Sequence, residues 1–338
     1  MFQSRILYNL AVKYKDLFSD LVEMEDILGR RFTGMDDAVH ALMLSVAGGE
    51  PLLLIGPPGT AKSRLIRAFC GMIGLLDEND PSKPHDLYFE YLLTPFTEPG
   101  ELFGFFDIPK VVDAKRMERL DTGMMQNAEV VYLDEVFNGS SAILNSILSF
   151  LNERMFHDYG TRKKVAMECL FAATNDVPDT PELRAVFDRF VLRCHVDNID
   201  LSPESMGQLL RKGWRETYGT HDHGRFSSMM EGFKDFRHEI KRATDAGELE
   251  PSANHPYYRK LTQLIHYARQ YELSEVSNRR LIKMVFLMLI HRIFQAVKED
   301  DFPEDMALGS AQLALMPRFF LDRFDDELAW KMVAAAGD

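Results

Sequence analysis

The sequence predicts an α/β fold, with a central parallel sheet covered by helices on both faces and followed by an all-helical region. The first observation is that short apolar runs alternate with segments whose apolar residues recur at helical spacing. Runs that are apolar throughout are typical of strands buried on both faces, which occur in parallel sheets. The second observation is that no convincing strand follows residue 203. We therefore expect a core from residues 1–198, including N-terminal helices, and a helical domain from residues 199–338.

The elements can be placed in order along the chain. Residues 1 to about 48 are expected to be helical, and Gly48-Gly49-Glu50-Pro51 ends that pattern. Helices are also expected after Lys62 and over residues 140–154, the latter capped by Ser140 or Ser141. The expected strands are residues 52–55, 87–92, 130–133, 169–173 and 190–196.

The bulk composition argues against several classes of protein. The 338 residues carry a net charge of −13, which disfavours a protein that coats nucleic acid through bulk electrostatics. The three cysteines are scattered, lack zinc-ligand spacing and fit a reducing compartment. The N-terminus lacks the apolar core of a signal peptide, and the apolar run at residues 284–290 is too short to span a bilayer. We expect a cytoplasmic protein with no membrane insertion, and nucleic acid is not an expected partner.

The stretch GPPGTAKS nearly matches the phosphate-binding loop G-x-x-x-x-G-K-[ST]. In such a loop, backbone N–H groups and the N-terminus of the following helix point at phosphate oxygens. Ala61 stands where a glycine is expected: a left-handed conformation would cost alanine about 1–2 kcal/mol, whereas a place in the first helical turn would cost nothing. Lys62 would reach the β- and γ-phosphates and Ser63 would bind Mg²⁺. The candidate nucleotide-binding residues are Gly56, Pro57, Pro58, Gly59, Thr60, Ala61, Lys62 and Ser63.

A second motif, VVYLDEV, covers residues 130–136. It predicts a buried strand that delivers two adjacent carboxylates to its C-terminal end, where ligands bind in open α/β sheets. Asp134 would hold Mg²⁺, directly or through water, and Glu135 would polarise an attacking water. An apolar run that ends in Asp-Glu is common by itself. About seventy residues after a phosphate loop, it indicates a nucleotide site.

The segment FAATND, residues 171–176, predicts a strand that ends on two polar residues. The side chain of Asn175 would then lie beside the γ-phosphate and position the attacking water. The alternative is that Asn175 only starts the turn that leads to Pro178.

Two arginine motifs complete the set. In FDRF, Arg189 forms either a surface ion pair of little value or an arginine finger for a neighbouring subunit's nucleotide, with Arg184 just upstream. In SNRR, Ser277 or Asn278 can cap a helix whose first turn holds Arg279 and Arg280. Cations are unfavourable at a helix N-terminus, so these arginines are either functional or merely solvated.

In this order, GPPGTAKS, VVYLDEV, the ATN of residues 173–175, FDRF and SNRR resemble Walker A, Walker B, sensor 1, arginine finger and sensor 2 of an AAA+ ATPase. The stretches FEYLLTPFTEPGELFG and ELRAVFDRFVLR, and residues 118–154, resemble the MoxR group and, within it, RavA-like proteins. The resemblance covers about residues 20–300 and is strongest over residues 50–195. In that group GPPGTAKS is a usual spelling of the loop.

The resemblance implies an AAA+ αβα P-loop core followed by an all-α lid domain, assembled into an oligomer that is expected to be a hexameric ring. The implied cofactors are ATP/ADP and Mg²⁺. Catalysis would fall to Glu135 and Asn175, to Arg189 as the finger supplied in trans, and to Arg279 as the lid sensor. Arg184 and Arg280 are second choices for the two arginine roles.

The resemblance also implies a partner with a von Willebrand factor A domain, with which the ATPase remodels, activates or matures a client protein that the sequence does not identify. The group carries two β-hairpins. Residues 105–122 fit the first, with residues 107–112 as one strand, and residues 155–167 fit the second, turning at residues 158–160. The basic run Arg162-Lys163-Lys164 would then contact a partner.

Two other functions are consistent with the same motifs. One is a nucleotide-gated assembly switch with little turnover, which the presence of Glu135 disfavours. The other is a nucleic-acid loader or motor, which the acidic balance of the chain disfavours.

Overall fold

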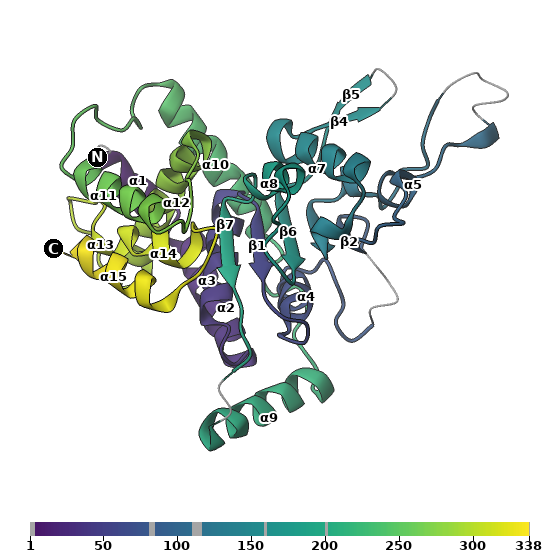
Figure 1. The fold of residues 1–338 in the computed structure, drawn as a ribbon, viewed down its shortest axis with the longest axis horizontal. Coiled ribbons are helices and arrows are strands. Elements are labelled where there is room, and N and C mark those ends of the chain that lie inside the picture. Colours follow the sequence, from purple (N-terminus) through teal and green to yellow (C-terminus); the bar gives the residue numbers. More distant parts are fainter. Residues whose placement is uncertain (1–3, 81–84, 110–116, 159–160, 200–201, 338) are drawn as a thin grey trace. The chain divides into compact units, whose positions relative to one another are not determined.

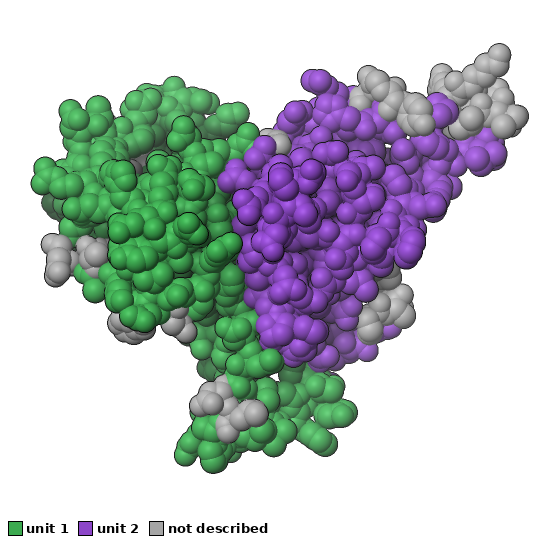
Figure 2. Space-filling model, in the orientation of Figure 1, with its two compact units in different colours: residues 1–50, 191–219, 228–338 green, residues 51–190, 220–227 purple. Residues whose placement is uncertain are grey.

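The computed structural model describes residues 4–80, 85–109, 117–158, 161–199 and 202–337 (Figure 1). The chain divides into two compact units that alternate along the sequence (Figure 2). Unit 1 comprises residues 1–50, 191–219 and 228–338, and unit 2 comprises residues 51–190 and 220–227. Each unit is described by itself below.

The central sheet has the strand order β2-β3-β6-β1-β7. Its strands are β1 (Leu52–Ile55), β2 (Tyr88–Leu92), β3 (Val130–Asp134), β6 (Cys169–Thr174) and β7 (Leu192–His195). The ladders β1–β6, β2–β3 and β3–β6 are parallel. All five predicted strands are present, which confirms the predicted fold class. The last strand is shorter than predicted because the N–H of Phe190 donates to the carbonyl of Phe187 in a turn, 3.1 Å away.

The helices of unit 2 cover both faces of its strands. They are α4 (Lys62–Met72), α5 (Pro99–Phe103), α7 (Ser141–Glu153) and α8 (Pro181–Phe187), with short 3-10 turns at η1 (Met125–Asn127) and η2 (Val136–Asn138). On one face, Phe69 of α4 packs edge-on against Phe171 of β6. On the other, Ala172 belongs to the cluster that contains Ile147 of α7. The predicted cap of α7 is Ser140, whose side chain accepts from the N–H of Ile143.

One of the two expected hairpins is present as predicted, and the other only in part. β4 (Met155–Asp158) and β5 (Thr161–Lys164) pair in antiparallel fashion, as predicted. The base of the other hairpin is also antiparallel, since Phe106 bridges Arg119. However, residues 108 and 109 are helical, so the strand predicted over 107–112 is wrong there. Residue 109 is a proline, which has no N–H to give to a ladder. Residues 110–112, and 159–160 of the predicted turn, lie outside the described residues.

Apart from the strand β7, the elements described in unit 1 are helices. They are α1 (Ser4–Lys13), α2 (Lys15–Arg31), α3 (Asp36–Gly48), α9 (Pro203–Tyr218), α10 (Met229–Asp245), α11 (Tyr257–Gln270), α12 (Asn278–Lys298), α13 (Ser310–Leu313), α14 (Leu315–Phe319) and α15 (Asp326–Gly337). Beyond β7 the described residues contain helices and connecting segments without a strand, as predicted. No helix in the described part of the chain combines the length and apolar character needed to cross a membrane.

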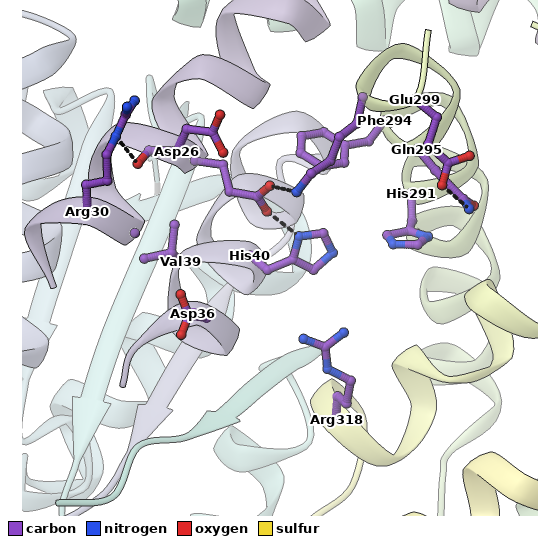
Figure 3. Close-up of a pocket in the computed structure, with 13 residues that line it drawn as sticks. Asp26, Arg30, Asp36, Val39, His40, His291, Phe294, Gln295, Glu299 and Arg318 are labelled. Carbon is purple, nitrogen blue, oxygen red and sulfur yellow. Dashed lines mark hydrogen bonds and ion pairs between the residues drawn. The ribbon is translucent and has the colours of Figure 1, made fainter. Parts of the chain in front are cut away.

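Unit 1 contains a cavity of about 560 Å³ with a polar wall formed largely by α2, α3 and α12 (Figure 3). His40 Nδ1 lies 2.5 Å from Glu25 Oε1, and Lys298 donates to the same carboxylate. His291 Nδ1 lies 3.0 Å from Gln312 Nε2, which donates to it. Burial, reinforced by the positive potential of His40 and Arg318, lowers the pKa of His291 to about 3. His291 is therefore neutral in the folded protein at ordinary pH.

The neutral His291 makes stability depend on pH. Between pH 6.5 and about 3 the unfolded chain binds a proton at this position that the folded chain does not, so the free energy of unfolding falls as pH falls. We expect His291 to contribute a loss of roughly 2 kcal/mol between pH 6.5 and 5. Urea unfolding of wild type and His291→Gln at several pH values measures the difference in slope.

This pH range distinguishes the contribution of His291 from that of Glu25. Burial opposes ionisation of Glu25, but bonds from His40 and Lys298 outweigh it and lower the pKa of Glu25, so its contribution is lost only in more acidic solution. His238→Gln, at an exposed position, is the matched control. Equal pH dependence in His291→Gln and wild type would contradict the assignment.

Candidate functional site

The loop between β1 and α4 holds the first part of the site. Ala61, the residue before α4, is left-handed, with φ 62° and ψ 21°. Of the two conformations that the sequence allows, this is the one that costs alanine about 1–2 kcal/mol relative to glycine. Gly59 is also left-handed (φ 88°), and a Cβ atom there would meet nothing within 4 Å. Backbone conformation, rather than crowding, is therefore the reason for glycine at this position.

Lys62 lies inside this loop. Its ammonium group donates to the carbonyls of Gly56 and Pro57, 2.6 and 2.9 Å away, and lies 3.4 Å from the hydroxyl of Thr60. The residue is 7% exposed. Burial lowers the pKa of Lys62, while the carboxylates of Asp134 and Glu135 oppose the shift. The loop thus encloses a cation next to two carboxylates, which is an arrangement suited to binding phosphate and metal together.

Ser63 and Asp134 are 71 positions apart in the sequence and in contact in the structure. The hydroxyl of Ser63 donates to Asp134 Oδ2, 2.9 Å away. The other carboxylate oxygen of Asp134 accepts from the backbone N–H of Glu135 at 3.0 Å. Tyr132 donates its hydroxyl to Ser63 Oγ at 3.1 Å. Hydroxyl and carboxylate oxygens are ligands that Mg²⁺ prefers, so these residues fit a magnesium site.

Glu135 follows β3 in a left-handed conformation, with φ 51° and ψ 47°. A non-glycine residue rarely adopts this conformation, and such strain clusters at functional sites. Burial and the neighbouring Asp134 raise the pKa of Glu135, while Lys62 and a hydrogen bond from the backbone of Asn175 oppose the shift. A carboxylate with a raised pKa accepts a proton more readily, as a general base must.

Asn175 follows β6 at the same end of the sheet. The carbonyl of Thr174 accepts the N–H of Gly56 at 3.1 Å, which joins this strand end to the start of the loop. The side chain of Thr174 donates to the carbonyl of Asp176 at 3.0 Å. A hydrogen bond from the backbone of Asn175 to Glu135 joins the third motif to the two carboxylates, so the structure gathers these segments and the loop at one place within unit 2.

Arg189 is not among the residues that these hydrogen bonds join. It lies in the turn after α8, where its guanidinium is 3.4 Å from the carboxylate of Asp188, and its side chain is 23% exposed. Arg184 is exposed on α8 itself. The role of either arginine at a nucleotide stays a prediction.

Arg279 and Arg280 belong to unit 1, at the start of α12. Ser277 caps this helix, its side chain accepting from the N–H of Arg280. Arg280 is 3% exposed and donates to Asp322 at 2.8 Å. Arg193 of β7 also pairs with Asp322. The carboxylate of Asp322 therefore offsets the unfavourable position of a cation at the helix N-terminus. Arg280 thus has a structural role, whereas Arg279 is exposed.

Two polar residues of these clusters were assigned no role from the sequence, Tyr132 and Asp322. Tyr132 is a polar residue inside an apolar strand, a signal that would have pointed to it. Asp322 lies 42 positions from Arg280 in a region without a motif, so nothing in the sequence indicated their contact.

The chain is similar to a described family and to several known proteins. Residues 19–231 match a family model described as the MoxR domain in the MoxR-vWA-beta-propeller ternary systems. Two uncharacterized proteins of Methanocaldococcus jannaschii are 35% and 36% identical over 58% and 56% of this chain. A structural protein of the Acidianus two-tailed virus is 29% identical over 60% of this chain and 32% of its own length.

The alignments cover 48% of each M. jannaschii relative, so the chain spans about half of their length. A crystal structure from Cytophaga hutchinsonii, described as a "putative ATPase", matches with a TM-score of 0.58 at 14% identity. That match covers 98% of this chain and 97% of the other, and at this identity it is a likeness of fold.

Proposed function

The chain belongs to the MoxR family of AAA+ ATPases, and we propose that it hydrolyses ATP with Mg²⁺ to remodel, activate or mature a client protein. The observation that carries the proposal is the contact of Ser63 with Asp134, 2.9 Å long, beside the enclosed ammonium of Lys62. Ser63 and Asp134 are distant in sequence, and their contact next to Glu135 supports a site for phosphate and metal.

In the proposed reaction each residue has one task. Lys62 and the backbone N–H groups of the loop bind the phosphates. Ser63 and Asp134 would hold Mg²⁺, which would supply positive charge to offset that of the phosphates. Glu135 accepts the proton of the attacking water, and Asn175 orients that water. Arg189 and Arg279 stabilise negative charge on the transferring phosphoryl group.

We also propose the domain arrangement and the assembly that the resemblance implies. Residues 1–198 act as the nucleotide-binding core and residues 199–338 as the lid and C-terminal helices, within a hexameric ring. Among the lid arginines, the exposed Arg279 suits the sensor role better than Arg280, because Arg280 is buried against Asp322.

The proposed partner is a protein with a von Willebrand factor A domain. The description of the matching family supports it, since it refers to ternary systems of MoxR, vWA and beta-propeller. A β-propeller protein is therefore a second proposed partner. We propose that these proteins act together in the cytoplasm.

The nucleotide site is tested by Lys62→Ala. Loss of charged hydrogen bonds worth about 1.5–3 kcal/mol should weaken ATP binding by roughly 10–150-fold, as measured by calorimetry. Arg67→Ala is the matched control, because it removes a charge from the exposed side of the same helix, where Arg67 pairs with Glu90. Unchanged affinity in Lys62→Ala, with circular dichroism showing a folded protein, would overturn the phosphate-loop assignment.

A further inference from the structure

Helix α9 of unit 1 is labelled in Figure 1. Large apolar and aromatic side chains are exposed along one side of it. Leu210, Trp214 and Tyr218 are 63%, 68% and 70% exposed. Their spacing of four residues places them on one side of the helix. The rings of Trp214 and Tyr218 lie 4.5 Å apart between centroids. We call these three residues the α9 face.

The opposite side of α9 is anchored to α2. Glu216 is 6% exposed and accepts from Nε and Nη2 of Arg31, each 2.8 Å away. Lys212 donates to the carbonyls of Gly29 and Phe32, 2.9 and 3.4 Å away. At 100° per residue, Lys212 and Glu216 lie about half a turn from the α9 face. The bidentate ion pair therefore holds the helix in one orientation, with its aromatic residues outward.

The α9 face is flanked by positive charge. Arg211 and Arg215 are exposed beside it, and neither forms an ion pair within the described ranges. Large exposed apolar side chains are costly to leave in water, and Trp, Tyr and Arg dominate the energetics of protein interfaces. The charge and the residue types together indicate a surface for an acidic protein partner.

We propose that the α9 face docks on an acidic surface of a second copy of this chain. Charge complementarity favours this occupant, because the chain carries a net charge of −13. Arg211 and Arg215 disfavour a symmetric contact through the same face, because the like charges of two copies would then lie close together. The contact is therefore head-to-tail, and a repeated head-to-tail contact closes into a ring when its rotation permits. This inference rests on the oligomer of the proposed function and assigns one of its surfaces.

Sedimentation velocity in ATP and Mg²⁺ tests the assignment. Trp214→Ala/Tyr218→Ala and Arg211→Glu/Arg215→Glu should each raise the dissociation constant of assembly at least tenfold. Gln208→Ala, an exposed position on the same helix, should assemble like wild type. Circular dichroism should show unchanged helix content, and ATP affinity should be unchanged, since the α9 face lies in unit 1 and the loop in unit 2.

The outcomes separate this inference from the proposed function. If both double variants assemble like the wild type, the proposed docking surface is wrong, and the proposed ATPase function is unaffected. A second outcome would also overturn the docking surface. In it, the wild type binds phosphatidylglycerol vesicles, both double variants lose this binding, and all three proteins assemble equally well. That result would assign the α9 face to a membrane surface instead. A wild type that binds ATP and stays monomeric at all concentrations would overturn both the docking surface and the proposed ring.

Discussion

The Glu135→Gln variant is expected to hydrolyse ATP about 10²–10⁴-fold more slowly than wild type and to bind ATP with wild-type affinity. Glutamine keeps the length and shape of the side chain but cannot accept a proton. The burial and the neighbouring Asp134 that raise the pKa of Glu135 make the wild-type carboxylate a better proton acceptor. Removing this group should therefore slow the chemical step without disturbing the phosphate contacts of Lys62.

Steady-state hydrolysis measured against protein concentration, with calorimetry for ATP, tests this prediction. Glu153→Gln is the control, because it makes the same chemical change at an exposed position of unit 2. A rate per subunit that rises with concentration would support a site shared between copies. If Glu135→Gln hydrolyses ATP at the wild-type rate, Glu135 is not the general base. A negligible rate in both proteins, with ATP bound, would instead support the nucleotide-gated switch.

The Arg189→Ala variant is expected to lose about 10³–10⁵-fold in kcat, the range typical of an arginine finger, while its ATP affinity changes little. A finger contacts charge that develops in the transition state, so its loss affects turnover more than binding. Arg184→Ala is the matched control, three residues before the end of α8. Arg184 is the alternative finger, and its substitution should leave turnover intact.

Mixed assemblies test whether Arg189 acts in trans. A site between an Arg189→Ala subunit and a Glu135→Gln subunit combines an intact Glu135 with an intact Arg189. Mixing the two inactive variants should therefore restore part of the activity, once labelled subunits have been shown to exchange. Absence of recovery despite exchange would contradict the trans arrangement, and a loss of turnover in Arg184→Ala alone would transfer the role to Arg184.

The parts of the fold that the sequence predicted correctly are those with a local signal. β1, β3 and β6 are short apolar runs, and the polar residues at their ends follow from the motifs. Because parallel strands end at one edge of a sheet, the meeting of Ser63 with Asp134 could be expected as well. The conformation of Ala61 could not, because a first helical turn and a left-handed residue were both compatible with its neighbours.

The remaining features depend on contacts between distant segments. Two adjacent arginines lie in the first turn of α12. Arg280 is buried and donates to Asp322, whereas Arg279 is exposed, and the sequence near them does not indicate this difference. Residues 220–227 likewise join unit 2 through backbone bonds, as when the N–H of Phe226 donates to the carbonyl of Met72 at 2.9 Å. Backbone pairing of this kind depends little on side-chain type, so no sequence pattern marks it.

The inclusion of residues 220–227 in unit 2 has a mechanical consequence. The backbone passes from one unit to the other at 50/51, 190/191, 219/220 and 227/228. A single linker would act as a swivel, whereas turning one unit against the other here requires torsion angles to change at four places together. The four crossings therefore mean that neither unit is one continuous stretch of chain, and neither could be excised as a single fragment.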